Sequence, residues 1–167
     1  MAKFSFKVSS FTPVAVADTV AFTDGGYMAL QGGSATARID ISEISVSGIA
    51  AASAPSILLL SRDSTVGATP TALGAGNSNA PLDPGSAALT TPPVAFVAST
   101  TKPQRSATAG LLNLSLNAFG GIYRWVANQG SEIRMLGNAA AFGEISLSHF
   151  TGGVPGLIGA HIIYEPM

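Results

Sequence analysis

The stretch that decides the fold is Leu112-Asn113-Leu114-Ser115-Leu116-Asn117, in which leucine alternates strictly with a small polar residue. Successive side chains of a β-strand point to opposite faces, so this order gives a strand one apolar and one polar face. Such alternation predicts a half-buried strand, because the apolar residues of a helix recur every three or four positions instead. We therefore expect the surrounding chain to be built from strands.

The same period of two recurs along most of the chain. Near its start, Phe4, Phe6 and Val8 fall on one face of a predicted strand, and lysine and serine fall on the other. No stretch combines the apolar period of a helix with capping residues at both ends. Further strands are predicted over residues 14–22, 27–31, 37–46, 57–60, 94–97, 122–126, 132–136, 142–148 and 158–164.

Two of these predicted strands carry an extra detail. After Ile41 the next apolar residues are Ile44 and Val46, one position out of phase. A one-residue slip would turn side chains to the wrong face, so we expect a β-bulge near Ser42-Glu43. The continuous apolar run Ile57-Leu58-Leu59-Leu60 favours a strand that is covered on both faces.

About nine or ten short strands separated by Gly-rich turns favour an all-β fold, a β-sandwich or jelly roll, in one domain spanning 1–167. Residues 64–93 and 99–110, rich in Pro, Gly, Ala, Ser and Thr, interrupt the pattern. Irregular segments this long usually have a function or are disordered. Two interpretations stay open, a floppy surface loop or an extended arm ordered against a neighbouring subunit. We favour the arm because prolines reduce the entropy lost on ordering.

Charged residues are scarce. The chain has 8 Lys and Arg and 9 Asp and Glu, or 10% of its residues, against about 25% in ordinary soluble domains. A surface with few ions costs little to desolvate, so this composition favours assembly with other protein. The net charge of −1 provides no field to attract nucleic acid, and no stretch has the character of a membrane span. We expect neither as a partner, and the start of the chain does not resemble a signal peptide.

Residues suited to catalysis are equally scarce. There is no cysteine, and His149 and His161 are too few for most metal sites. We expect both histidines to be structural, and we expect no enzyme activity, cofactor, metal or small-molecule substrate. Tyr123 and Trp125 share one face of a predicted strand, with Arg124 opposite. They are interpreted as core anchors or, alternatively, as a flat platform for a glycan.

Four segments also carry a resemblance when they are taken in order: 57–73 (ILLLSRDSTVGATPTAL), 91–96 (TPPVAF), 119–127 (FGGIYRWVA) and 159–166 (GAHIIYEP). From about residue 55 onward, the chain resembles small virion proteins of tailed bacteriophages and prophages. Within that class it is most similar to head decoration, or cement, proteins. The resemblance implies a small β-sandwich or jelly roll that sits as a homotrimer on the outside of a capsid. It implies no catalytic residue.

The function expected from these observations is structural. We expect a decoration protein on the capsid surface of a virion, synthesised in the host cytoplasm, whose partners are other copies of itself and the major capsid protein. The contacts are predicted from the strand of Phe4, Phe6 and Val8, by β-augmentation, and from the arm residues Pro70, Leu73, Pro81, Leu82 and Pro84. The alternative is a carbohydrate- or receptor-binding β-sandwich module of a phage tail or fibre, with Tyr123 and Trp125 as its platform.

Overall fold

The computed structural model describes residues 4–12, 22, 26–74, 79–138, 142–149 and 156–167, without the side chains of Phe6 and Ser9. These residues form twelve strands and no helix. The all-β prediction is confirmed, although the described residues alone contain more strands than the nine or ten expected. Most of the strand expected over 14–22 lies outside the described residues.

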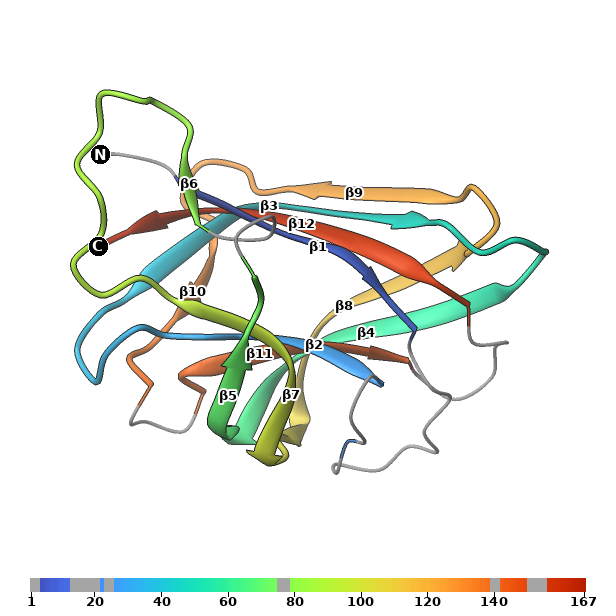
Figure 1. Ribbon diagram of the computed structural model, residues 1–167, viewed down its shortest axis with the longest axis horizontal. Helices are drawn as coiled ribbons and strands as arrows, with labels where there is room; N and C mark the ends of the chain where they lie inside the picture. The colour runs from blue at the N-terminus through green and yellow to red at the C-terminus, as the bar shows by residue number, and fades with distance from the viewer. Residues whose placement is uncertain (1–3, 13–21, 23–25, 75–78, 139–141, 150–155) are drawn as a thin grey trace.

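The strands form two antiparallel sheets that face each other as a sandwich (Figure 1). In the first sheet, β9 (Ile122–Val126) and β10 (Ile133–Met135) both pair with β3 (Ile39–Gly48), which is followed by β12 (Ile158–Pro166), β1 (Phe4–Phe11) and β6 (Ala80–Pro81). In the second sheet the order is β5 (Ala68–Ala72), β7 (Val94–Thr101), β2 (Tyr27–Gln31), β11 (Glu144–His149), β4 (Pro55–Thr65) and β8 (Gln104–Asn117). The sandwich prediction is confirmed.

The pairing follows a nested order. β1 pairs with β12, β2 with β11, β3 with β9, and β4 with β8, so the chain resembles one long hairpin folded over on itself. Phe4 lies opposite Tyr164, which brings the two ends of the chain together at one end of the sandwich (Figure 1). The same order places β8 and β9 along one side edge of the sandwich, and β1, β5 and β6 along the other.

The main core lies between the sheets, where the alternating leucines point. Leu114 of β8 is fully buried opposite Leu58 of β4, and Leu112 lies opposite Leu60. The alternation of 112–117 is therefore confirmed as a strand. In the run 57–60, however, Leu58 and Leu60 are buried whereas the other two residues are only half-buried, so cover on both faces is incomplete.

The bulge predicted in the third strand is confirmed. In the ladder with β12, β3 carries one extra residue, Ser42, between the partners of Ile163 and Tyr164. An extra residue shifts the side-chain phase by one position. Because of it, Ile41 and Ile44 both point into the main core and are fully buried.

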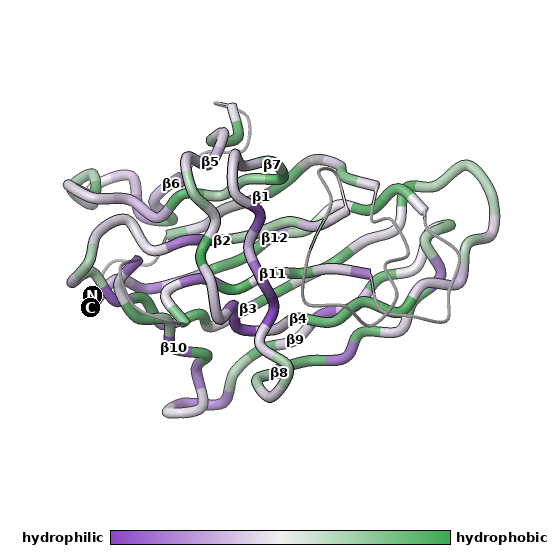
Figure 2. The backbone as a smooth tube through the Cα atoms, turned by 90° about the horizontal axis from the view of Figure 1, so that it is seen from below, coloured by the Kyte–Doolittle hydropathy of each residue, from purple (hydrophilic) through white to green (hydrophobic). Residues whose placement is uncertain are grey.

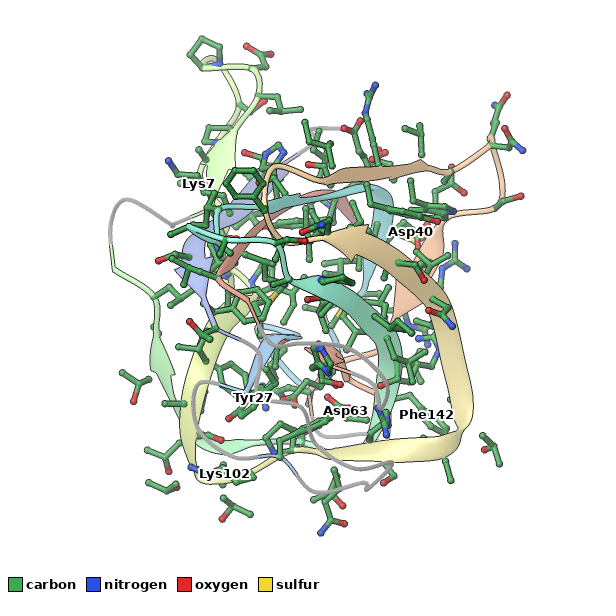
Figure 3. All side chains as sticks on the ribbon, turned by 90° about the vertical axis from the view of Figure 1, so that its right-hand side faces the viewer. Lys7, Tyr27, Asp40, Asp63, Lys102 and Phe142 are labelled. Carbon is green, nitrogen blue, oxygen red and sulfur yellow. The ribbon has the colours of Figure 1, made fainter. Side chains whose placement is uncertain are left out.

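The second sheet also curls around its outward face and encloses a second, smaller core. Figure 3 shows Tyr27 inside the ring that the curled strands draw. Its ring packs against Phe22, with ring centroids 5.3 Å apart, and against Phe96 at 6.1 Å. As a result β2 and β11, which are central in this sheet, are buried on both faces.

The prediction of a loop over residues 99–110 is wrong. Residues 99–101 belong to β7, and residues 104–110 belong to β8. Small Ser, Thr, Ala and Gly residues made this segment look irregular, yet each can occupy an extended strand when a neighbouring strand supplies its backbone hydrogen bonds.

The 64–93 segment runs along its own chain in the residues that the structure describes. β5 extends the second sheet by pairing with β7, and β6 extends the first sheet by pairing with β1. Asn79 links the two sheets. Its Nδ2 donates to the carbonyl of Pro93, just before β7, at 2.9 Å, and its Oδ1 accepts from the hydroxyl of Tyr164 on β12 at 2.7 Å. Contact of this arm with a neighbouring subunit stays a prediction.

Candidate interaction surface

One end of the sandwich is closed by two loops, residues 49–54 between β3 and β4, and residues 118–121 between β8 and β9. The backbones of these loops are bonded to each other. Ala50 donates to the Ala118 carbonyl at 2.8 Å, and Ala118 donates to the Ala54 carbonyl at 2.8 Å. The two loops therefore form one fixed unit.

Asn117, the last residue of the stretch that decides the fold, reinforces this unit. Its Oδ1 accepts from the backbone N–H groups of Ala54 and Phe119, both at 2.9 Å, and its Nδ2 donates to Ser53 Oγ at 2.9 Å. The backbones also approach closely, because a Cβ at Gly121 would lie 2.3 Å from the Asn117 carbonyl oxygen. Only glycine fits there.

Three large apolar side chains are exposed on this end: Ile49 at 46%, Phe119 at 59% and Ile122 at 78%. A backbone bond of 2.7 Å from Gly48 to Gly121 holds the first and last of them together in space. A single exposed apolar side chain is ordinary, but apolar residues gathered on a rigid end are typical of a protein contact.

Charge is absent from the chain segments that build this region. Residues 44–61 and 106–123 contain no Asp, Glu, Lys or Arg, and the ladder between β4 and β8 brings the two runs together. We name the exposed and half-buried residues of these segments the neutral surface and divide it into an end, within residues 49–54 and 118–122, and a flank, within residues 55–57 and 110–117. Figure 2 colours the outermost loop at this end, on the right, in pale green.

The flank contains a shallow groove of about 440 Å³ between β4 and β8. Its walls mix apolar and small polar groups and hold no ion. A partner side chain could enter it without stripping water from a charged group, which is the main cost of forming a polar contact. The lining residues are Pro55, Ser56, Ile57, Ser115, Leu116 and Asn117.

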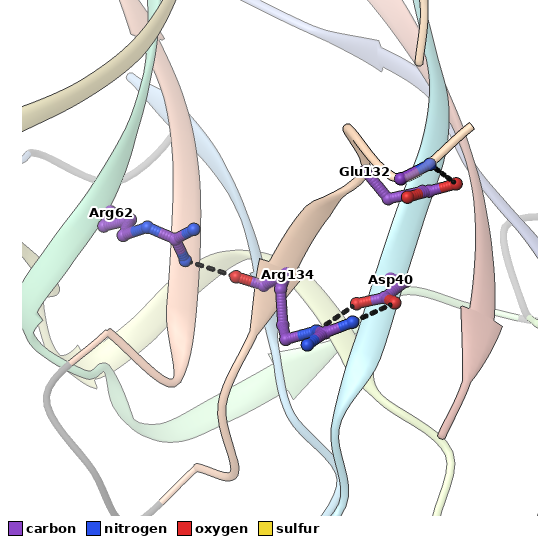
Figure 4. Close-up of polar contacts among 5 residues, drawn as sticks. Asp40, Arg62, Glu132 and Arg134 are labelled. Atoms are coloured by element: carbon purple, nitrogen blue, oxygen red, sulfur yellow. Dashed lines mark hydrogen bonds and ion pairs between the residues drawn. The ribbon is translucent and has the colours of Figure 1, made fainter. Parts of the chain in front are cut away.

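The charged groups on the nearby strands of the first sheet are already paired. Arg124 on β9 binds Glu43 through two bonds of 2.7 and 2.8 Å, and this hydrogen bonding lowers the pKa of the Glu43 carboxyl. Arg134 binds Asp40 in the same way, with both bonds at 2.8 Å, while its own carbonyl accepts from Arg62 (Figure 4). Paired in this way, the charges add little to the field around the neutral surface.

The first part of the predicted contact set needs a correction. Phe4 and Val8 are 2% and 4% exposed, because the apolar face of β1 points into the main core. Their side chains therefore present little surface to a partner, although Phe4 lines a pocket with Asn79 and Pro81. The side chain of Phe6 lies outside the described residues. Among those residues, β6 pairs with β1 only at Phe4 and Ser5, so addition of a partner strand to β1 stays a prediction that concerns its backbone edge.

The predicted arm contacts lie nearer to solvent. Pro81, Leu82 and Pro84 are exposed, with Leu82 at 54%, whereas Pro70 and Leu73 are half-buried. Their contact with a partner is not tested by this placement and stays a prediction.

The predicted glycan platform has a different setting. Tyr123 and Trp125 share one face of β9, and Arg124 lies on the other, as the alternation indicated. Both rings are half-buried and pack against the main core. This placement favours the core-anchor interpretation over a flat, exposed platform.

The neutral surface itself was missed by sequence reasoning, although its signal was present. The two uncharged runs are plain in the sequence, but nothing in either run shows that they pair with each other. The contacts were instead assigned to the arm and the first strand.

Within the described residues, no group of three or more His, Cys, Asp or Glu side chains could hold a metal ion. No helix in this part of the chain is long and apolar enough to span a membrane. Comparisons with models of protein families, with curated proteins and with solved structures found no match.

Proposed function

We propose that the protein is a structural component of a tailed-phage virion, which binds the outside of the capsid as a homotrimer and stabilises the shell. The observation that carries this proposal is the neutral surface. It is rigid, partly apolar and free of ions, so covering it with protein removes apolar area from water at little desolvation cost.

The order of the strands supports the same proposal. Without β5, β6, β7 and β10, the sheets read β9-β3-β12-β1 and β8-β4-β11-β2. This is the order of a jelly roll, a fold found in viral capsid domains and also in lectins and cupins. The fold alone does not give the function. It does explain how two loops come to share one end.

We assign the flank to contacts between copies and the end to the shell. The flank runs parallel to the strands, so a symmetry axis along the strands would bring three flanks together and leave the end free for another protein. Stabilisation then follows by linkage, because a protein that binds only the assembled shell lowers the free energy of that state. Three linked sites raise the avidity further.

The experiment that tests this function is co-sedimentation with shells of the major capsid protein encoded in the same genome. The wild-type protein is expected to pellet with the shells and to raise their melting temperature. Phe119→Lys with Ile122→Lys places two charges on the end at exposed positions, and we expect binding to weaken at least tenfold, which is about 1.4 kcal/mol.

A matched control carries the same added charge elsewhere. Asn128 and Gln129 are exposed in the β9–β10 loop, and the variant with both changed to Lys should bind as the wild type does. No binding of the wild-type protein would contradict the proposed function. Equal binding by all three proteins would contradict the assignment of the end.

A further inference from the structure

A row of four polar side chains crosses the second sheet inside its curl. Gln31 on β2 lies opposite Glu144 on β11, and Asp63 on β4 lies opposite Arg105 on β8. Gln31 is 7% exposed, Arg105 is 4% exposed and both carboxyl side chains are 0% exposed. Figure 3 shows Asp63 inside the curl. Burial of this many ionisable groups in one row is costly unless their charges balance.

The charges of the row balance only with one bound proton. Arg105 offsets one carboxylate, and a second ionised carboxylate would leave a net negative charge in a buried place. Asp63 Oδ1 accepts from Ser146 Oγ at 2.7 Å, while Asp63 Oδ2 and Glu144 Oε1 are buried and take no hydrogen bond from any described donor. A proton on Asp63 that is donated to Glu144 satisfies both of these oxygens.

The environment favours this protonated state. Burial, together with the smaller effect of the neighbouring Glu144, raises the pKa of Asp63 to about 9. Burial also raises the pKa of Glu144. Other titratable or charged side chains lie in this half of the sandwich. They are Tyr27 on β2, Arg105 on β8, His149 on β11 and Lys102 in the β7–β8 turn, and β5 and β7 carry none.

Glu144 of this carboxyl pair also holds a point of the backbone, together with Gln31. Glu144 Oε2 accepts from the Gly67 N–H at 3.0 Å and from Gln31 Nε2 at 3.0 Å, and Gln31 Nε2 also donates to the Gly67 carbonyl at 2.9 Å. Both the N–H and the carbonyl of Gly67 are therefore held by hydrogen bonds with these two side chains, an arrangement that we name the Gly67 clasp. A Cβ at this position would lie 2.9 Å from Phe96 Cζ, so the glycine fits closely against the second core.

Beyond Gly67, the chain is attached at separate points: Thr100 Oγ1 donates to the Ala68 carbonyl at 2.8 Å, the Leu73 N–H donates to the Ala95 carbonyl at 2.9 Å, and Asn79 is hydrogen-bonded as described above. β5 is largely exposed and pairs only with β7, with an irregular register. Thr69 has a φ of 48°, a left-handed conformation that costs free energy for a residue other than glycine. The clasp is thus the buried attachment at the start of β5.

We propose that Asp63 and Glu144 share one proton that latches Gly67 and the start of β5 onto their own sheet. While the proton is bound, the Gly67 clasp is closed. When a base in alkaline solution removes it, two carboxylates face each other against one guanidinium, and their repulsion opens the clasp and releases the start of β5. This latch is independent of the proposed virion function.

Limited digestion with trypsin tests the latch. Arg62 and Arg105 bracket the segment, and the one basic residue between them, Lys102, precedes Pro103 and resists cleavage. Between pH 7.5 and 9.5, the ionised fraction of a group with a pKa of about 9 rises by about twentyfold. Cleavage after Arg105, measured against a short arginine peptide in the same tube, should rise by a comparable factor and release residues 63–105.

Two variants decide the outcome. Asp63→Asn keeps the shape and donates to Glu144 without a titrating proton, so its cleavage should rise less than twofold. Asp40→Asn changes an acid outside the curl and should keep the full rise. Glu144→Gln replaces the first variant if that protein does not fold. An equal rise in Asp63→Asn and the wild type, no rise in the wild type, or cleavage spread over all basic sites would overturn the latch.

Discussion

Asp63 couples the stability of the protein to pH. In the unfolded chain this carboxyl is ionised above its ordinary value of 3.8, whereas in the folded chain its pKa is about 9. Folding therefore takes up a proton between these values. The stability that this group contributes is fully present below pH 3.8 and is lost as the pH rises toward 9.

For the wild-type protein we accordingly expect the free energy of unfolding to fall by up to about 1.4 kcal/mol per pH unit between pH 5 and 8. Asp63→Asn removes the proton uptake and leaves Glu144 balanced by Arg105. Its unfolding free energy at pH 8 should exceed that of the wild type by about 2–4 kcal/mol. Urea denaturation at several pH values measures both effects, and parallel pH profiles for the two proteins would refute the protonated state.

Residues whose role is set by near neighbours were predictable. The bulge at Ser42 follows from a slip in the apolar phase within a few positions, and such a slip is visible in the sequence. The role of Asp63 was not predictable, because its partner Glu144 is remote in the chain and the curl that buries both depends on the whole second sheet. An acid before Ser64 looks like an ordinary surface residue until that sheet is assembled.

Elements were predictable where their side chains alternate. The strand from Leu112 to Asn117 and the strand from Ile158 onward were found by their period of two. The segment 99–110 was misjudged because small residues carry little periodic signal, and its strands form only because β4 and β5 offer partners. Composition also could not show that β5 pairs with the second sheet and β6 with the first.

The arm is the element whose removal is most informative. We expect that replacing residues 70–90 with a Gly/Ser linker will remove β6 and most of β5 and leave the eight nested strands intact. Loss of the Tyr164–Asn79 hydrogen bond costs about 1 kcal/mol, which lowers the melting temperature of a domain of this length by about 2–4 °C, and loss of the packing of Leu73 and Leu89 against the main core lowers it further. Trimer formation and shell binding are lost if the arm reaches a neighbour.

Circular dichroism and sedimentation provide the two readouts for this variant. A folded variant that still assembles would show that the arm contacts are dispensable. A variant that does not fold would show instead that β5 and β6 belong to the essential framework.

For the whole molecule, the decisive property is where charge is missing. The sequence shows that ions are scarce and predicts an assembling surface, but it does not locate that surface. The pairing of β4 with β8, together with the β3–β9 pairing and the hydrogen bonds between the two loops, joins residues 44–61 to residues 106–123 and concentrates the uncharged runs on one end and one flank. The position of the neutral surface is therefore set by the fold and not by either uncharged run alone.

The central claim is that other copies of the protein cover this flank, and sedimentation velocity over a wide concentration range tests it most directly. The wild-type protein should sediment as a trimer, and the variant with both Asn113 and Ser115 changed to Lys should sediment as a protomer of about 16.8 kDa. The control with Lys at positions 128 and 129 should remain a trimer. A wild-type protein that stays a protomer at every concentration would contradict the account.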